Sequence, residues 1–244
     1  MGKRILALLF VLLLLGSVPL AEGNVPSVGN VPSVGSETAT PTYAAYNGKR
    51  IAVQTGTISG EVAQAVIGDV QLDYYNSQID AMTALRANKA DAWATDEPVA
   101  RYLLIENTDL ELIEEKLDSS SLAAVFARTD AGQALCDQYS AFLDSLWSDG
   151  TMAEIDAIWF GTDDDRRTVL DYEALPDTNG TLRMAVDTSM VPFAFMKDNR
   201  VVGYDVDIAA RFCEAYGYRL EVVPMSFDGI LPCATSMKPS RLSL

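Results

Sequence analysis

Gly48-Lys-Arg-Ile-Ala-Val-Gln-Thr-Gly-Thr57 is the stretch that decides the fold, because it has the pattern of a buried strand running into a tight turn. Residues 49–54 are the predicted strand, and the Gly-containing turn follows directly. Residues 59–67 then have helical spacing, with Val62 and Val66 on the predicted apolar face. The stretch therefore predicts a strand that leads into a helix.

The same alternation continues along the chain. Residues 70–75 predict a second strand, and Ser77 with Asp80 predicts a capped helix after it. Residues 91–95 predict a third strand, after which Asp96 is placed to cap another helix. Strands that alternate with helices favour a parallel sheet, so the sequence predicts an α/β class.

A second unit with the same character is predicted towards the C-terminus. A long helix begins near residue 132, and a short helix with a capping box begins at Thr151. Residues 181–187 are a predicted strand, followed by a hairpin turn at an Asp-Asn pair. Residues 205–216 predict a helix and residues 219–223 its partner strand, which again indicates α/β packing.

The N-terminus has the layout of a secretory signal peptide. Lys3 and Arg4 precede an apolar run over residues 5–15, and small residues follow up to residue 23. The run is shorter than the roughly 20 residues that a membrane-spanning helix needs. We therefore expect residues 1–23 to be a cleaved leader, with an uncut leader as the alternative. Residues 24–47 contain a direct Asn-Val-Pro-Ser-Val-Gly repeat and predict a disordered linker.

Composition excludes several function classes. The formal charge is -16, so the field of the protein repels phosphate backbones and nucleic acid is not an expected partner. The chain has no histidine, which removes the commonest general base and every Ser-His or Cys-His pair. Its three cysteines, Cys136, Cys213 and Cys233, are widely spaced and predict buried apolar residues instead of a zinc site. We expect no enzyme activity, no cofactor and no metal.

Four segments resemble one protein family, the extracellular solute-binding proteins of family 3, the polar amino-acid class with a type II periplasmic-binding-like fold. Residues 48–57 are similar to the start of the second lobe in that family. Residues 90–96, Ala-Asp-Ala-Trp-Ala-Thr-Asp, resemble its strand that ends in a ligand-binding aspartate. Residues 147–161 are similar to the C-terminal ending, and residues 180–231, which follow that ending, are similar to the opening of the first lobe.

The resemblance implies a periplasmic-binding-protein-like II fold with one near-complete lobe and a partial second lobe in permuted order. The implied divisions are a signal peptide (1–23), a disordered linker (24–47), the second lobe and C-terminal helices of a solute-binding domain (48–161), a linker (162–179), the start of the first lobe of a second solute-binding domain (180–232) and a divergent tail (233–244). Sequence alone leaves open whether residues 180–232 dock on residues 48–161 as in a circular permutant.

An amino-acid ligand presents an ammonium, which needs an anionic acceptor, and a carboxylate, which needs donors. By resemblance, Asp96 and Asp187 meet the ammonium or the ligand side chain, and the start of the predicted 59–67 helix offers backbone donors to an anion. The candidate ligand-binding residues are Gln54, Thr57, Ile58, Ser59, Asp96, Asp187, Met190, Phe193 and Phe227. Capping roles for the two aspartates, a plain turn at residues 55–59 and core packing for the aromatic residues remain alternatives.

The expected function is extracytoplasmic binding of a small polar solute, an amino acid, for an ABC permease. The family's arginine for the ligand carboxylate has no match, and Arg241 near the C-terminus does not fit that role. Expected partners are the ligand and the permease, with membrane contact only through the permease or an uncut leader. The expected location is periplasmic or extracellular, at the cell surface. A sensor domain of a signalling protein and a non-functional truncated fragment are the alternatives.

Overall fold

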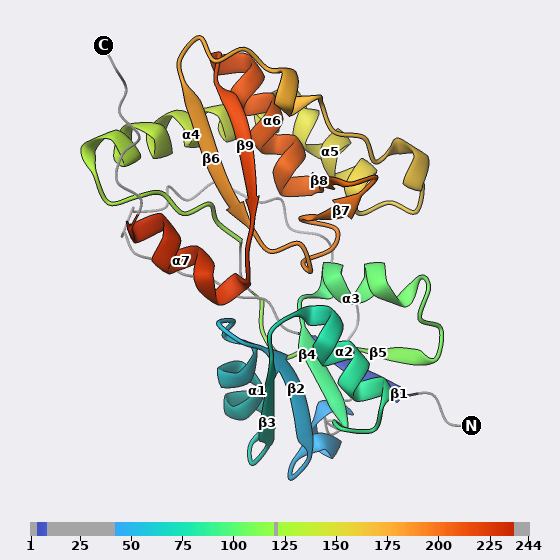
Figure 1. Ribbon diagram of the computed structural model, residues 1–244. Coiled ribbons are helices and arrows are strands. Elements are labelled where there is room, and N and C mark those ends of the chain that lie inside the picture. Colours follow the sequence, from blue (N-terminus) through green and yellow to red (C-terminus); the bar gives the residue numbers. More distant parts are fainter. Residues whose placement is uncertain (1–3, 9–41, 120–121, 237–244) are drawn as a thin grey trace, which may run out of the picture.

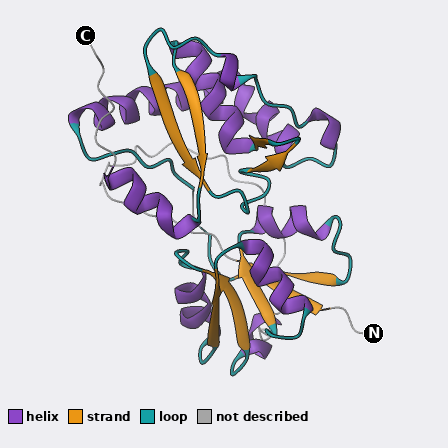
Figure 2. Cartoon of the chain, in the orientation of Figure 1, coloured by secondary structure: helices purple, strands orange, loops and turns teal. Residues whose placement is uncertain are grey.

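The computed structural model describes residues 4–8, 42–119 and 122–236, which divide into two lobes (Figure 1). Residues 4–8 and 42–119 form the N-terminal lobe, and residues 122–236 form the C-terminal lobe. Helices pack around parallel strands in both (Figure 2). The predicted α/β class is therefore confirmed. None of the described helices is both long enough and apolar enough to cross a bilayer.

The N-terminal lobe is built on one five-stranded sheet in the order β3-β2-β4-β1-β5. Its elements are β1 (Arg4–Leu8), η1 (Thr42–Tyr46), β2 (Arg50–Gln54), α1 (Ser59–Ile67), β3 (Gln71–Tyr75), α2 (Gln78–Arg86), β4 (Ala92–Thr95), α3 (Glu97–Leu104) and β5 (Leu110–Lys116). All neighbouring strands are parallel. The carboxyl ends of β2, β3 and β4 therefore meet at one edge of the sheet, where ligands bind in open α/β sheets.

Strand β1 lies within the predicted leader and pairs with both β4 and β5. The five-stranded sheet thus includes residues of the predicted leader. Residues 9–41, which hold the rest of the predicted leader and most of the predicted linker, lie outside the described residues. The end of that linker is ordered, because η1 packs Tyr43 and Tyr46 against the lobe. The predicted disordered linker is thus too long at its C-terminal end.

Helix α1 has its predicted bounds, but its predicted apolar face is only half right, because Val62 packs on the core and Val66 does not. Ala63 and Ile67 are buried, whereas Val66 is 37% exposed. The helix approaches β3 so closely that a Cβ at Gly60 would lie 3.1 Å from Leu72 Cδ1. Small residues on the inner face permit this close packing. The predicted cap of α2 is confirmed, since the hydroxyl of its capping serine accepts the Asp80 N–H at 3.0 Å.

The C-terminal lobe has a parallel pair, β6-β9, and an antiparallel hairpin, β7-β8. Its elements are α4 (Asp130–Asp149), α5 (Thr151–Trp159), η2 (Asp164–Arg166), η3 (Tyr172–Ala174), β6 (Thr181–Val186), β7 (Phe195–Lys197), β8 (Arg200–Val202), α6 (Tyr204–Tyr216), β9 (Arg219–Pro224) and α7 (Phe227–Ser236). Asp198 and Asn199 form the predicted hairpin turn with positive φ angles of 50° and 63°. Residues 122–127 belong to no helix or strand.

The predicted capping box at Thr151 is wrong. Helix α4 ends at Asp149, and Gly150 adopts a left-handed conformation with a φ of 87°. That glycine therefore serves both as the C-cap of α4 and as the N-cap of α5. Because a single residue makes the turn, Thr151 already lies inside α5 and cannot cap it.

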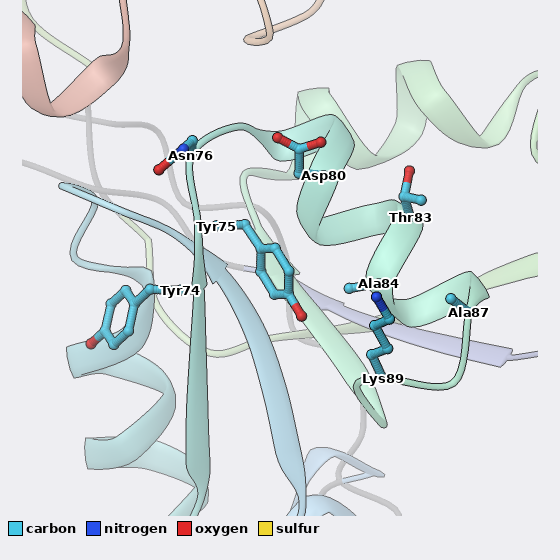
Figure 3. Close-up of a pocket in the computed structure, with 8 residues that line it drawn as sticks. All are labelled: Tyr74, Tyr75, Asn76, Asp80, Thr83, Ala84, Ala87 and Lys89. Atoms are coloured by element: carbon cyan, nitrogen blue, oxygen red, sulfur yellow. The ribbon is translucent and has the colours of Figure 1, made fainter.

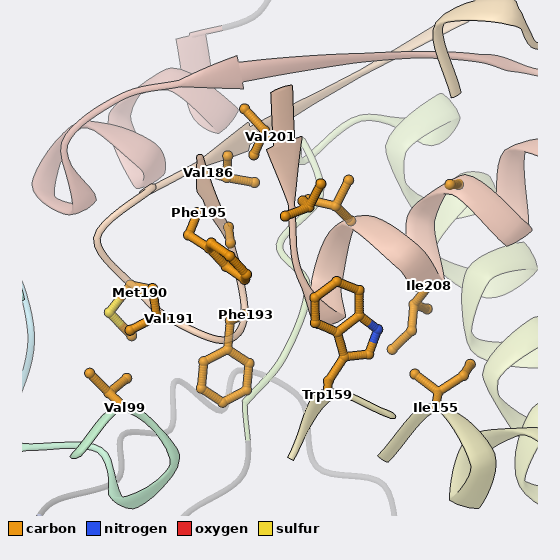
Figure 4. Close-up of a cluster of buried hydrophobic side chains, with 14 of the residues drawn as sticks. Val99, Ile155, Trp159, Val186, Met190, Val191, Phe193, Phe195, Val201 and Ile208 are labelled. Carbon is orange, nitrogen blue, oxygen red and sulfur yellow. The ribbon is translucent and has the colours of Figure 1, made fainter. Parts of the chain in front are cut away.

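Helices α4 and α5 dock on α6, which lies later in the chain. The Phe212 ring of α6 lies 5.1 Å from the ring of Tyr139 and 5.5 Å from that of Phe142, both on α4. Trp159 of α5 is fully buried and donates from Nε1 to Asp207 Oδ2 at 3.0 Å. Residues 130–160 and 180–220 therefore share one core, part of which is shown in Figure 4.

The segment 162–179, predicted as a linker, packs on the same lobe. Tyr172 is buried and donates its hydroxyl proton to the Val201 carbonyl at 3.0 Å, and Leu175 is buried beside it. The segment thus contributes apolar contacts to the C-terminal lobe as well as connecting its two parts. Of the three cysteines, only Cys213 is buried as expected, and burial raises the pKa of its thiol to about 12.

Candidate ligand site between the lobes

Gln54 and Asp187 join the two lobes at the carboxyl ends of their strands. Gln54 is the last residue of β2, and Asp187 directly follows β6. Gln54 Nε2 donates to Asp187 Oδ2, and Asp187 Oδ1 accepts the Ser189 N–H at 2.8 Å. Both side chains are buried. Two candidate residues that lie 133 positions apart are therefore in direct contact.

Gln78, the first residue of α2, makes a second polar junction. Its Oε1 accepts from Trp93 Nε1 at 3.0 Å and from Thr95 Oγ1 at 2.9 Å, which fixes the amide. Its Nε2 then faces Met190 Sδ at 3.6 Å, and its backbone N–H donates to Ser189 Oγ at 3.3 Å. The candidate residue Met190 thus lies against the N-terminal lobe.

Asp96 follows β4 at the same edge of the sheet and is only 5% exposed. It occupies the N-cap position of α3, but its side chain makes no capping hydrogen bond. Its Oδ1 has no hydrogen-bond partner among the described residues. Burial in this place raises the pKa of the Asp96 carboxyl to about 7. The capping alternative therefore does not account for this side chain.

A second buried acceptor without a partner lies at this edge. Gln54 Oε1, like Asp96 Oδ1, is buried and receives no hydrogen bond within the described part of the chain. Buried polar atoms in native proteins are nearly always paired, so each unpaired atom requires an explanation. Two acceptors at the carboxyl ends of β2 and β4 suit a ligand that brings N–H donors, and an ammonium group carries three.

At the start of α1, where an anion site is predicted, the side chains are largely occupied by contacts within the chain. Thr57 donates its hydroxyl proton to the Gln54 carbonyl at 2.9 Å, while Ile58 packs on the N-terminal lobe and Ser59 is buried. Helix α7 begins against the adjoining turn, since a Cβ at Gly56 would lie 2.9 Å from Asp228 Cα. A bound anion would therefore lie near the negative charge of Asp228.

The two aromatic candidates pack at different depths. Phe193 is 4% exposed and its ring lies 5.7 Å from that of Phe160 and 6.1 Å from that of Tyr204. These contacts favour core packing for Phe193, which is drawn in Figure 4. Phe227 is the first residue of α7 and is half-buried at the edge of the same cluster.

Sequence reasoning missed Gln78, Thr95 and Ser189 in this region. A usable signal was present for Gln78, because it lies three residues after the end of β3, and β3 neighbours β2 in the sheet. Residues that follow adjacent parallel strands lie side by side. Ser189 gave no comparable signal, since its contact with the other lobe depends on how the lobes dock.

A separate groove of about 340 Å³ lies on the outer surface of the N-terminal lobe (Figure 3). It is lined by Tyr74, Tyr75, Asn76, Asp80, Thr83, Ala84, Ala87 and Lys89. Most of these side chains are exposed, and none carries a buried polar atom without a partner. We place the candidate ligand site between the lobes because the unpaired acceptors of Gln54 and Asp96 lie there.

Comparison with known proteins gives a family relationship for part of the chain. Residues 182–238 match the model of the bacterial extracellular solute-binding proteins, family 3. A solved structure described as "Crystal structure of the substrate binding protein of an amino acid ABC transporter" is 24% identical, with a TM-score of 0.43. The similarity covers 52% of this chain and 56% of that one, so this chain spans little more than half its length. The family match confirms the predicted resemblance: over residues 182–238, this chain is related to the bacterial extracellular solute-binding proteins, family 3.

Proposed function

We propose that the chain binds a small polar solute that carries an ammonium group, an amino acid, between its two lobes and delivers it to an ABC permease. The observation that carries the proposal is the buried carboxyl of Asp96, one oxygen of which has no hydrogen-bond partner in the described part of the chain and lies at the sheet edge facing the C-terminal lobe. The role is binding and not catalysis. The family to which residues 182–238 are related supports an extracytoplasmic location.

The ligand's ammonium would complete the hydrogen bonding of this edge. A buried carboxylate is costly unless it is paired and hydrogen-bonded, and without a ligand the raised pKa keeps Asp96 partly protonated. An ammonium beside it would favour the carboxylate and supply charge-assisted hydrogen bonds, which are stronger than neutral ones. Gln54 Oε1 provides a second acceptor for the same group.

The proposed architecture is periplasmic-binding-protein-like II in permuted order. The five-stranded N-terminal lobe corresponds to a near-complete lobe, and the C-terminal lobe, with its parallel pair β6-β9, corresponds to a partial one. Support comes from the shared core, in which α4 and α5 pack on α6 although they precede it in the chain. The two sets of strand ends then face each other across the candidate site.

A thermal-shift screen of the common amino acids, followed by calorimetry of any that bind, tests the function. An amino acid present at 100 times its Kd should stabilise the wild-type chain by about 2.7 kcal/mol. Asp96→Asn should abolish this shift, because a neutral amide cannot pair with an ammonium. Asp80→Asn is the matched control: it removes a carboxyl that follows β3 and lines the outer groove, and it should leave the shift intact.

Two results would count against the proposal. The first is a screen in which no amino acid stabilises the wild-type chain. The second is a ligand whose shift disappears in Asp80→Asn and persists in Asp96→Asn, which would move the site to the outer groove.

A further inference from the structure

A buried arginine in the segment 162–179 contacts the helix that follows Asp96. Arg167 is 5% exposed, and its guanidinium carbon lies 4.7 Å from the centroid of the Tyr102 ring. Tyr102 belongs to α3 in the N-terminal lobe, whereas Arg167 follows η2 in the C-terminal lobe. The contact therefore joins the two lobes through a cation and an aromatic face.

The guanidinium of Arg167 is held in a fixed orientation. One terminal nitrogen donates to the Asp164 carboxylate at 3.1 Å, and the other donates to the Gly161 carbonyl at 2.5 Å. Hydrogen bonds from Lys197 and then from Arg167 keep the pKa of Asp164 below its ordinary value, so Asp164 stays ionised at neutral pH. A planar cation anchored at two points provides a rigid surface for the Tyr102 ring.

Helix α3 has further contacts with the same lobe. The Tyr102 ring lies 5.7 Å from the ring of Phe195 on β7. Near the start of the helix, the Val99 side chain points toward Met190 and Val191 (Figure 4). Asp96 is the residue directly before this helix. Any displacement of α3 from the C-terminal lobe would therefore move Asp96 as well.

We propose that Arg167 is a positioning residue that, by stacking on Tyr102, holds α3 and with it Asp96 against the C-terminal lobe. Its importance for ligand binding rests on the proposed function, but the contact itself does not. Arg167 acts through α3 and need not touch the ligand. The segment that carries it then has a role in arranging the site as well as in connecting α5 to β6.

Amide hydrogen exchange of residues 97–104 tests the proposal without any ligand. Arg167→Met removes the cation and should make these amides exchange about tenfold faster, as expected from the loss of a desolvated cation–π contact. Tyr102→Leu removes this contact and also the ring contact with Phe195, so it should accelerate exchange at least as much, whereas Tyr102→Phe, which keeps the ring, should not. The double variant Arg167→Met with Tyr102→Leu should exchange no faster than Tyr102→Leu alone, because the loss of the Tyr102 ring already removes the contact with Arg167.

Arg200→Met is the matched control. Arg200 stacks on Tyr172 at 4.1 Å and bonds to the Asp171 carboxylate and the Leu170 carbonyl, but all these groups belong to the C-terminal lobe. Its loss should leave exchange in α3 unchanged.

A carbon-13 NMR titration adds a readout at the site: the pKa of Asp96 should fall towards its ordinary value in Arg167→Met, as water reaches the carboxyl, and stay unchanged in Arg200→Met.

The proposal is overturned if exchange in α3 is unchanged in Arg167→Met, or if it rises equally in Arg200→Met, or if the two single effects add in the double variant. Should Arg167→Met fail to fold, as judged by circular dichroism, Tyr102→Leu carries the test, because it leaves every hydrogen bond of Arg167 in place. A negative amino-acid screen would refute the proposed function and leave these exchange results standing.

Discussion

Asp96→Asn is expected to raise the free energy of unfolding by about 4 kcal/mol at pH 8 and to leave it nearly unchanged at pH 3.5. Burial raises the pKa of Asp96 from 3.8 to about 7 in the folded chain. Between those two values the unfolded chain has lost the proton that the folded chain keeps, so wild-type stability falls as the pH rises. Above pH 7 both forms are ionised and the difference stays constant. An asparagine does not titrate, so in Asp96→Asn this position adds no pH dependence to the free energy of unfolding.

Urea denaturation of both proteins between pH 3.5 and 8.5 measures the effect. Asp205, whose pKa burial also raises to about 7, is present in both proteins and cancels in the difference. Glu97→Gln provides a neighbouring control with the opposite sign, because bonds to Lys116 and then to Arg101 lower the pKa of Glu97. That variant should be less stable than the wild type above about pH 4.5. Parallel pH profiles for the wild type and Asp96→Asn would contradict the burial of an unpaired carboxyl.

Phe212→Ala should destabilise the chain by about 3–5 kcal/mol, because it opens a cavity where α4 docks on α6. Phe212 is 2% exposed and its ring contacts Tyr139 and Phe142 of α4. Trp147→Ala is the control, since Trp147 lies on the same α4 helix but is 61% exposed. Its effect should stay within about 0.5 kcal/mol.

Urea denaturation at a single pH compares these two variants. The comparison tests whether residues 130–160 and 180–220 share one core or fold apart. If Phe212→Ala costs no more than Trp147→Ala, the helices α4 and α6 are not packed together and the permuted arrangement fails.

Much of the fold could be predicted because the deciding patterns are local. Strand β2, helix α1 and the cap of α2 follow from residue spacing within short windows. Strand β5 was missed, since Leu110–Lys116 contains four charged residues and only Leu110 and Ile113 are buried. Helix α7 was missed because its sequence contains Pro232, which ordinarily opposes a helix interior. The position of β1 between β4 and β5 depends on partners roughly a hundred residues away, which no local pattern can indicate.

In the candidate site, too, some residues could be predicted from local patterns and others could not. Asp96, Gln54 and Asp187 could be predicted because each lies at the carboxyl end of a recognisable strand and matches a family motif. Gln78 and Arg167 were not selected, because their roles arise from contacts between lobes. Gln78 becomes part of the site only through Met190 and Ser189, and Arg167 meets Tyr102 across 65 residues of chain. Such contacts follow from docking and not from local spacing.

The central claim is that the buried carboxyl of Asp96 receives the ammonium of the ligand, and calorimetry at two pH values tests it most directly. The amino acid selected by the thermal-shift screen is titrated into the chain at pH 6 and pH 8.5, each in two buffers of different ionisation enthalpy. Binding should release about one proton per ligand at pH 6, where Asp96 starts protonated, and almost none at pH 8.5. Equal heats in both buffers at pH 6, with binding intact, would contradict the claim.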